Sequence, residues 1–417
     1  MEVKPGYKQT EVGVIPEDWG VISAFDACSK IQDGTHFSPR IGGSGYLYVT
    51  SKNIRFGHLD MSTASWIDAA QHQAIYRRCD VKKGDLLLTK DGANTGNAAL
   101  NNLDEEFSLL SSVAFLRFNP SKHCAGYFLQ QVLTSQGQRQ IQDAMAGNAI
   151  TRLTLEKINK LRFPTPPTKP EQEAIAEALS DADALIESME QLLAKKRHLK
   201  QGAMQELLTG KKRLPGFSGE WEVKRLDELG RWTGGMTPSM RNPAFWQAGT
   251  VPWISSGDVK SARLIGTASA ISEYAVKQRT TTMLPTGSII VVTRSGILRK
   301  FLPVAMNMIP MAINQDIKAL LPNCHVLPDY VLHSLAYNGD RILARCLKSG
   351  TTVESVEFPW LKAFTIPIPP LPEQTAIAAI LSDMDTEITT LEAKLYKTRQ
   401  IKQGMMQELL TGRIRLA

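Results

Sequence analysis

A 45-residue segment occurs twice in this chain. Residues 170–214 and 372–416 share one pattern at an offset of 202 residues without a gap, and both copies begin with PEQ and end with KQGxMQELLTGxxRL. Solenoid repeats are much shorter, at roughly 20 to 50 residues per unit. The sequence therefore predicts one half-protein that is repeated, rather than a regular array.

Each copy predicts a long helix. After Pro170, apolar residues follow at alternating spacings of four and three, and Leu185, Leu192 and Leu199 repeat every seven residues, which is typical of a coiled coil. A helix that ends at Gly210 would be roughly 40 residues and ~60 Å long. The residues expected to pair the two helices and to dock a partner are Ile175, Leu179, Ile186, Leu193, Leu199, Ile377, Leu381, Ile388, Leu395 and Ile401.

The charge along each copy favours antiparallel pairing. The stretch from Glu171 to Glu190 contains seven acidic residues and no basic one. The stretch from Lys195 to Arg213 contains seven basic residues and a single acidic one, Glu206. Antiparallel helices place each acidic half against the basic half of the other helix. A single exposed pair contributes only ~0.2 to 1 kcal/mol, so the apolar seam supplies stability and the charges select direction. A spacer hairpin of unrelated purpose and a homodimerisation stalk stay open as alternatives.

The remaining sequence predicts two mixed domains. Strand-like runs at 46–50, 85–89 and 112–118 and a helical pattern at 125–142 lie in the first half, between glycine and polar clusters. Proline clusters mark the boundaries before each helix. We expect a first domain at 1–165, a first spacer helix at 166–212, a second domain at 213–368 and a second spacer helix at 369–417.

Composition places the chain among ordinary globular proteins. It is 43% hydrophobic and 21% charged, with no apolar run that would serve as a signal peptide or membrane span, so we expect a cytoplasmic protein without a membrane partner. Five cysteines without CxxC spacing suggest neither a disulfide framework nor a zinc site. The formal net charge of +7 suits a polyanionic partner.

Catalytic motifs are not convincing in this sequence. Residues 242–245, NPAF, approach the tetrapeptide with which adenine methyltransferases hold a target amino group, but no glycine-rich turn lies near it to hold S-adenosylmethionine. There is no GxxxxGK[ST] motif for ATP. We therefore predict no catalytic residue and no metal site. A self-sufficient methyltransferase and an adaptor without DNA contact are the competing hypotheses.

Polar loop clusters predict DNA binding instead. They combine flexible backbone with side chains that contact phosphates, and Asn or Gln pairs with adenine while Arg or Lys pairs with guanine. The candidate DNA-binding residues are Thr35, His36, Lys52, Asn53, Arg55, Lys90 and Arg152 in the first half, and Thr237, Arg241, Ser255, Arg294, Arg299, Asn314, Gln315, Lys348 and Thr351 in the second.

With these features the chain resembles the specificity subunits of Type I restriction-modification systems. The resemblance rests on the proline runs followed by PEQ, on the doubled helix ending, and on Gly350-Thr351-Thr352 ahead of the second proline run. It covers essentially the whole chain. The first half departs from the pattern, because Gly147-Asn148-Ala149 stands where the second half has Gly350-Thr351-Thr352.

The resemblance implies an α+β fold. Two similar mixed α/β target recognition domains would be separated by a pair of long antiparallel coiled-coil helices with pseudo-two-fold symmetry. Each domain would read one half of a bipartite double-stranded DNA target, and the helices would set the spacing and dock adenine methyltransferase subunits, two per chain. An ATP-dependent restriction endonuclease subunit would join them. This chain would hold no cofactor, and S-adenosylmethionine, ATP and magnesium would belong to the partner subunits.

Overall fold

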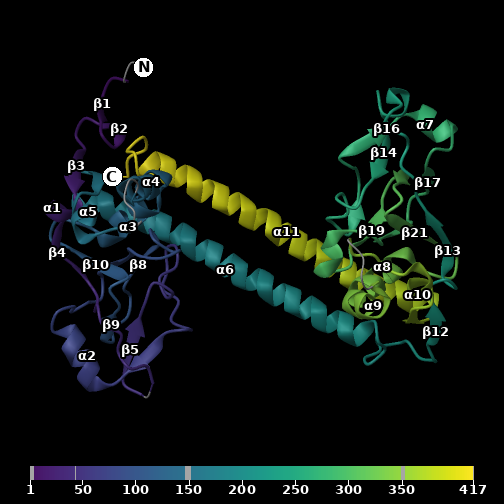
Figure 1. The fold of residues 1–417 in the computed structure, drawn as a ribbon, viewed down its shortest axis with the longest axis horizontal. Helices are drawn as coiled ribbons and strands as arrows, with labels where there is room; N and C mark the ends of the chain where they lie inside the picture. The colour runs from purple at the N-terminus through teal and green to yellow at the C-terminus, as the bar shows by residue number, and fades with distance from the viewer. Residues whose placement is uncertain (1–3, 43, 146–151, 349–352, 417) are drawn as a thin grey trace. The chain divides into compact units, whose positions relative to one another are not determined.

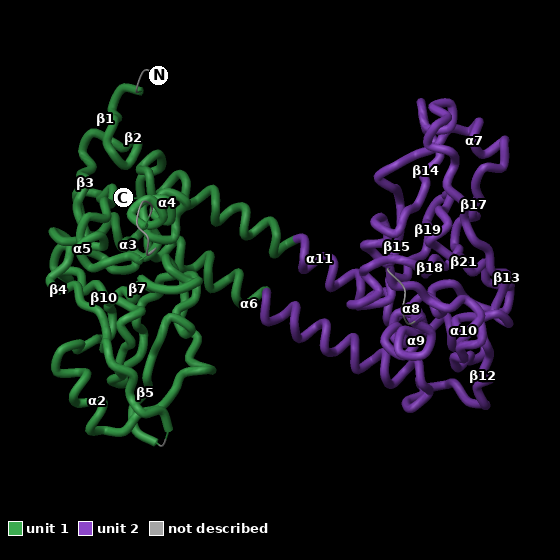
Figure 2. The backbone as a smooth tube through the Cα atoms, viewed as in Figure 1, with its two compact units in different colours: residues 1–189, 394–417 green, residues 190–393 purple. Residues whose placement is uncertain are grey.

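The computed structural model divides the chain into two compact units. It describes residues 4–42, 44–145, 152–348 and 353–416. Unit 1 comprises residues 1–189 and 394–417, and unit 2 comprises residues 190–393. The two colours of Figure 2 show this division, and each long helix changes colour along its length. Each unit is therefore built from one part of each long helix, and the four-part division of the sequence stays a prediction.

Unit 1 is a mixed domain of short strands and helices, many of which are labelled in Figure 1. Its elements are β1 (Tyr7–Thr10), β2 (Gly13–Pro16), β3 (Gly20–Ser23), α1 (Ala24–Ala27), β4 (Cys28–Asp33), β5 (Tyr46–Val49), β6 (Ser65–Ile67), α2 (Ala69–Tyr76), β7 (Leu86–Thr89), β8 (Ala98–Leu100), β9 (Phe107–Leu109), β10 (Val113–Phe118), α3 (Ala125–Leu133), α4 (Ser135–Met145), α5 (Leu155–Asn159) and β11 (Arg162–Thr165), followed by the long helix α6 (Lys169–Leu207).

Unit 2 repeats this composition. Its elements are β12 (Glu222–Arg225), β13 (Gly230–Gly234), the 3-10 helix η1 (Pro243–Phe245), β14 (Val251–Ile254), β15 (Arg263–Leu264), β16 (Ser269–Ile271), α7 (Glu273–Lys277), β17 (Thr282–Leu284), β18 (Ile289–Val292), the 3-10 helix η2 (Gly296–Arg299), β19 (Val304–Asn307), β20 (Met311–Ile313), β21 (Ile317–Pro322), α8 (Pro328–Tyr337), α9 (Gly339–Cys346), α10 (Phe358–Lys362) and β22 (Thr365–Ile368), followed by the long helix α11 (Leu371–Leu409).

The sheets of the two units have matching topology. Unit 1 has sheets of order β4-β10-β7-β8 and β6-β5-β9, and unit 2 has β13-β21-β18-β19-β15 and β16-β14-β20-β17. In the second sheet, β5 and β9 of unit 1 are parallel, and so are β14 and β20 of unit 2, whereas most other strand pairs are antiparallel. Strand β3 pairs with β11, and β12 pairs with β22, beside the start of each long helix. The prediction of two similar mixed α/β domains is confirmed.

One expected helix is interrupted. The pattern at 125–142 predicts a single helix, but α3 ends at Leu133 and α4 begins at Ser135 because Thr134 is extended, with a ψ of 157°. The Thr134 hydroxyl then accepts the Gly137 N–H at 2.9 Å, which caps the new helix. A Cβ on Gly137 would lie 2.3 Å from the Gln131 carbonyl oxygen, so the sharp junction requires glycine there.

Glycine ends both long helices. After α6 and α11, Gly210 and Gly412 have positive φ values of 70° and 69°. This left-handed conformation is the common helix C-cap, and it turns the chain out of the helix. A Cβ on Gly412 would lie 2.5 Å from the ring of Pro16, so the chain after α11 runs directly against the beginning of unit 1.

The long helices pair antiparallel within each unit. In unit 1, Lys402 of α11 forms an ion pair with Asp183 of α6. In unit 2, Lys196 and Arg197 of α6 each lie 2.6 Å from a carboxylate oxygen of α11, on Glu387 and Glu392 respectively. The basic part of one helix faces the acidic part of the other in both units, as the charge pattern predicts.

In each unit, an arginine that follows one long helix binds the glutamate of the PEQ motif at the start of the other long helix. In unit 2, Arg213 binds the buried Glu373 through two contacts of 2.7 Å, and the Trp221 indole donates to the same carboxylate at 3.0 Å. In unit 1, Arg415 binds Glu171 in the same two-pronged manner and also contacts Asp18 at 3.0 Å. These hydrogen bonds raise the pKa of Arg415. The duplicated sequence thus builds the same closure twice.

Only part of the expected apolar seam is buried. The seam residues Ile175, Leu179, Leu193, Ile377, Leu381 and Leu395 are at most 6% exposed. In contrast, Leu185, Leu192 and Leu199 are 49%, 44% and 51% exposed, and Ile401 is 52% exposed. The heptad of leucines therefore does not line the pairing seam, because the helix turns that face toward solvent. Ile186 and Ile388 are half-buried.

Burial of the seam predicts a large difference between two leucines. Leu381→Ala should destabilise the protein by about 2 to 5 kcal/mol, because the fully buried side chain leaves a cavity in the core of unit 2. Leu192→Ala makes the same change on an exposed face of α6 and should cost less than about 1 kcal/mol. Urea unfolding followed by tryptophan fluorescence measures both, and equal losses would contradict the assignment of the seam.

A histidine joins α8 to α11 in unit 2. The His333 ring lies 3.1 Å from the Ser382 hydroxyl and 3.8 Å from the Asp385 carboxylate, and burial lowers the pKa of His333 to about 4. Unit 1 has Gln130 at the corresponding place, and its amide donates to Asp183 at 3.2 Å. The same junction therefore titrates in unit 2 but contains no titratable group at this position in unit 1.

This difference predicts acid sensitivity of unit 2. Because the folded-state pKa of His333 is below its ordinary value of 6.5, the unfolded chain binds more protons between pH 6.5 and about 4, and stability falls as the pH is lowered through that window. The loss should reach up to about 3 kcal/mol. Stability curves of the wild type and of His333→Gln, which copies Gln130, should diverge below pH 6.5, and parallel curves would refute this role.

Candidate nucleic-acid interface

In unit 1, the candidate loops converge on the turn between β9 and β10. Residues 110–112 form this turn, which we call the central turn of unit 1. The Ser111 N–H donates to the Thr35 carbonyl at 2.8 Å, and the Ser112 carbonyl accepts the Lys90 N–H at 2.8 Å. The Ser51 N–H lies 3.4 Å from the Ser112 hydroxyl. Three segments far apart in sequence are therefore fixed around one turn.

Unit 2 has an equivalent centre at residues 314–316, its central turn. The Asn314 N–H donates to the Ile254 carbonyl at 3.0 Å, beside the loop of Ser255. The Asp316 carbonyl accepts the Arg294 N–H at 3.2 Å. Just before the turn, the Ile313 carbonyl accepts the Met236 N–H at 3.1 Å. The segments that carry candidate residues in unit 2 thus meet as they do in unit 1.

Several candidates are buried within these turns. Asn53 is 1% exposed; its side-chain oxygen accepts the Thr50 N–H at 3.0 Å and its amide donates to the Asp60 carbonyl at 3.1 Å. Asn314 is 5% exposed and its side-chain oxygen accepts the Asp316 N–H at 3.1 Å. The side chains of both asparagines hold the shape of the loop. Their direct contact with DNA stays a prediction.

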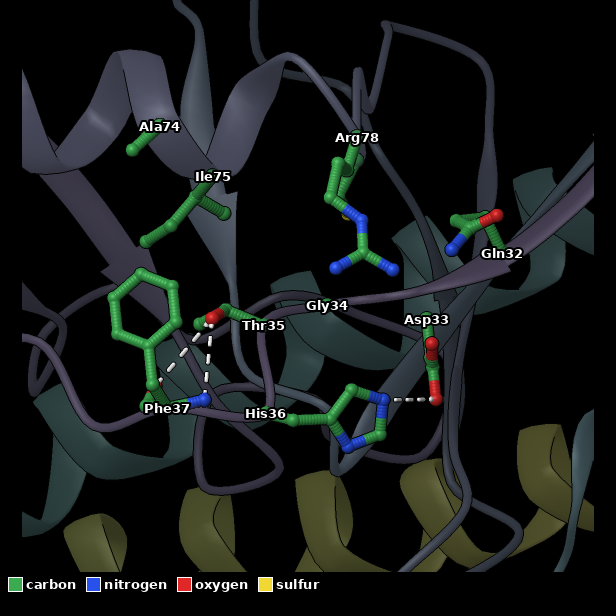
Figure 3. Close-up of a pocket in the computed structure, with 10 residues that line it drawn as sticks. Gln32, Asp33, Gly34, Thr35, His36, Phe37, Ala74, Ile75 and Arg78 are labelled. Atoms are coloured by element: carbon green, nitrogen blue, oxygen red, sulfur yellow. Dashed lines mark hydrogen bonds and ion pairs between the residues drawn. The ribbon is translucent and has the colours of Figure 1, made fainter.

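Lys90 lies under the loops of unit 1. Its side chain is 4% exposed, and its ammonium is 3.2 Å from the Asp33 carboxylate, itself 8% exposed, and 3.5 Å from Asp91. The His36 ring also approaches Asp33, at 3.4 Å, and Figure 3 shows this contact beside a cavity of about 320 Å³. Arg78 extends toward the same cavity from the end of α2. Lys90 is therefore part of a buried charge pair.

Three candidate guanidinium groups are already paired with carboxylates. Arg55 lies 3.0 Å from Asp60, whose pKa is lowered to about 2 by hydrogen bonds from Ser62 and Arg55. Arg152 lies 2.9 Å from Asp91, and this hydrogen bond raises the pKa of Arg152. Arg299 binds Glu354 and thereby lowers the pKa of that carboxyl. A phosphate would have to compete with these acids for each arginine.

Other candidates have exposed side chains. These are His36, Lys52, Thr237, Arg241, Arg294, Gln315 and Lys348. Ser255 is half-buried and its hydroxyl donates to Asp258 at 2.6 Å. Thr35 is 8% exposed and its hydroxyl accepts the Phe37 N–H at 3.3 Å. Thr351 lies outside the described residues. The exposed candidates include both hydrogen-bonding side chains and cations, which is the combination that nucleic-acid surfaces use.

The sequence pattern did not single out the central turn of unit 1. Ser111 and Ser112 stand between two largely buried strands, β9 and β10, and a polar pair in that place signals a turn. The NPAF motif has a local role, because the Asn242 side chain accepts the Ala244 N–H at 3.1 Å and caps η1. The cap depends only on neighbouring residues, whereas the role of the central turn becomes interpretable only with the pairing of distant strands.

None of the helices among the described residues contains an apolar stretch of the length that a membrane span requires. Within the same residues, no group of three or more histidine, cysteine, aspartate or glutamate side chains is arranged to hold a metal ion.

Comparison with known proteins gives consistent matches. The family model of the Type I restriction modification DNA specificity domain matches residues 45–195 and 218–400. The specificity subunit of the type I restriction enzyme EcoR124I/EcoR124II of Escherichia coli is 37% identical over 185 residues, which is 44% of this chain. That match spans 46% of the relative, so less than half of its length is covered.

Longer matches extend over the whole chain. The putative type I restriction enzyme MjaX specificity subunit of Methanocaldococcus jannaschii is 25% identical over 431 residues, which cover 98% of this chain and 97% of that protein. The crystal structure of a Type I restriction-modification system S subunit from M. genitalium superposes with a TM-score of 0.63 at 14% identity, covering 98% of each chain. The latter similarity concerns the fold alone.

The buried Lys90 predicts a stability defect that a surface lysine does not share. Lys90→Met should destabilise unit 1 by about 3 to 5 kcal/mol, because it leaves the Asp33 carboxylate buried without its partner. Adding Asp33→Asn should recover much of the loss. Lys52→Met, at an exposed position of the neighbouring loop, should change stability by about 0.5 kcal/mol or less. The denaturant midpoints of the wild type and the three variants measure these changes in stability. A Lys90→Met variant as stable as the wild type would contradict the pairing of Lys90 with Asp33.

Proposed function

Because this chain belongs to the family of Type I restriction-modification specificity subunits, we propose that it is the non-catalytic DNA-reading subunit of a restriction and methylation complex. Each unit reads one half of a bipartite double-stranded DNA target. The family is matched in both halves of the chain, at residues 45–195 and 218–400. Two matched segments on one chain give two reading surfaces, and hence a target of two parts.

The convergence of loops on a central turn carries this proposal. In unit 1 the turn at 110–112 holds the loops of Thr35 and Lys90. In unit 2 the turn at 314–316 holds the loop of Arg294, and Ile313 just before it holds that of Met236. The backbone frame is shared, whereas the side chains that it presents differ. A shared frame with different side chains is suited to two unlike half-targets, since direct readout depends on which donors and acceptors reach the base edges.

Exposed cations of the candidate loops supply the affinity for the phosphate backbone. Lys52 lies in unit 1, and Arg241, Arg294 and Lys348 lie in unit 2. Phosphate contacts position a protein on DNA and release counterions, so binding weakens as salt rises. The acid-paired Arg55, Arg152 and Arg299 contribute less, because DNA must displace a carboxylate first.

The long helices are proposed to set the spacing and to dock the methyltransferase subunits. Their pairing is fixed by the buried seam and by ion pairs in both units. Apolar side chains left exposed on the helices, Leu185, Leu192, Leu199, Tyr396 and Ile401, form candidate contacts for a partner. Two docked subunits per chain follow from the repeat. Those partners and an ATP-dependent restriction subunit supply S-adenosylmethionine, ATP and magnesium.

The proposal predicts a two-part methylation motif that depends on each unit separately. Cells that carry this chain and its methyltransferase partner should methylate a bipartite sequence, and cells without the chain should not. Exchanging residues 20–160 for the matching segment of another family member should change one half of the motif and leave the other unchanged. Methylome sequencing measures this. Unchanged methylation without the chain, or a change in both halves, would overturn the proposal.

The salt dependence of DNA binding provides a second test of the proposed function. With the chain in complex with its methyltransferase partner, Arg294→Ala should lower the slope of log affinity against log salt by about one, since one phosphate contact is lost. Lys224→Ala on β12 is the control, because it also removes one positive charge but lies outside the loops. The Lys224 ammonium is 2.6 Å from the Glu222 carboxylate. An equal effect of both substitutions would argue against a DNA surface at the central turn.

A further inference from the structure

The first loop of unit 2 is pressed against the central turn. Met236 and Thr237 follow Gly235, whose hypothetical Cβ would lie 2.1 Å from the Ile313 carbonyl oxygen and 2.3 Å from that of Asn314. No side chain fits in that space, so glycine permits the backbone of the loop to touch the backbone of the turn. Thr237 and Gln315 are therefore brought together by the packing of the backbone.

Two tryptophans fix the same loop from the other side. The Trp246 indole N–H donates to the Ser239 carbonyl at 3.2 Å, and the Trp253 indole N–H donates to the Met236 carbonyl at 3.5 Å. The two rings also contact each other edge to face, with centroids 5.2 Å apart. These bonds bracket Thr237, so the position of its hydroxyl is defined although the side chain is exposed.

The Thr237 hydroxyl donates a hydrogen bond to the side-chain oxygen of Gln315. This contact orients the amide of Gln315, because its oxygen faces Thr237 and its NH₂ group is turned away. Within the described residues, that NH₂ group has no hydrogen-bond partner. Gln315 is exposed at the middle of the central turn. It thus presents two hydrogen-bond donors outward and keeps its acceptor engaged.

The donors decide which base edge suits Gln315. Guanine offers two acceptors in the major groove, N7 and O6, whereas adenine offers the acceptor N7 and the donor N6–H₂. A free glutamine pairs with adenine by using its oxygen and its NH₂ group together. With the oxygen held by Thr237, the adenine amino group would have to share that oxygen, while the acceptors of guanine require only the NH₂ group.

We propose that Gln315 reads a guanine in the half-target of unit 2, and that Thr237 is the positioning residue that disfavours adenine there. This inference rests on the proposed function of unit 2 as a DNA-reading domain. In unit 1 the corresponding places hold His36 and Ser111, so no threonine–glutamine pair forms, and its base preference is set by other groups.

The test follows the methylation motif of four proteins in cells that supply the methyltransferase partner. The wild type should show guanine at one position of the unit 2 half. Thr237→Val frees the amide oxygen, and adenine should gain about 10-fold relative to guanine at that position. Gln315→Ala should lose the preference there. Thr267→Val is the control, since its hydroxyl donates to the Ser269 carbonyl and lies outside these loops; its motif should match the wild type.

The half-target of unit 1 serves as the internal measure of folding and of the proposed function. If no bipartite motif depends on the chain, the proposed function fails. If the bipartite motif is present but its unit 2 half lacks guanine, the inference is overturned. It is also overturned if Gln315→Ala changes the motif while the motif of Thr237→Val stays identical to that of the wild type. A Gln315→Glu variant should turn the same position toward cytosine, because a carboxylate accepts from the cytosine amino group.

Discussion

The rest of this structure depends on the pairing of an arginine after each long helix with the glutamate at the start of the other. Arg213 binds Glu373 in unit 2, and Arg415 binds Glu171 in unit 1. Each glutamate is almost fully buried and would be unfavourable without its partner. A tryptophan ring lies against each arginine. The guanidinium carbon of Arg213 is 5.4 Å from the ring centroid of Trp221, and that of Arg415 is 5.7 Å from the ring centroid of Trp19. This closure fixes the helix register on which the apolar seam relies.

Much of the architecture could be predicted because it is periodic or repeated. The offset of 202 residues, the helix ends at Gly210 and Gly412 and the antiparallel direction all follow from local patterns of charge, proline and glycine. The face of the helix was harder to assign. Leu185, Leu192 and Leu199 fit a heptad as well as the true seam does, and only the position of the neighbouring helix decides which stripe is buried.

The candidate site could be predicted at the level of loops but not of side chains. Sequence patterns place asparagine, lysine and serine in polar turns, yet they do not distinguish a side chain that holds its own turn from one that faces outward. Asn53 and Lys90 look equivalent to Lys52 in sequence, and the structure buries the first two. Asp60, the partner of Asn53, lies only seven residues away, whereas Asp33 reaches Lys90 through the pairing of β4, β10 and β7 across a long stretch of chain.

The sharing of each long helix between two units has a consequence for how the chain is made. The core of unit 1 includes Ile175 and Leu179 together with Leu409 and Leu410, which are synthesised after all of unit 2. Unit 2 lies within residues 190–393 and has all its parts earlier. The domain encoded second is therefore complete before the domain encoded first. Until residues 394–410 have been made, the part of α6 in unit 1 lacks the segment of α11 with which it pairs.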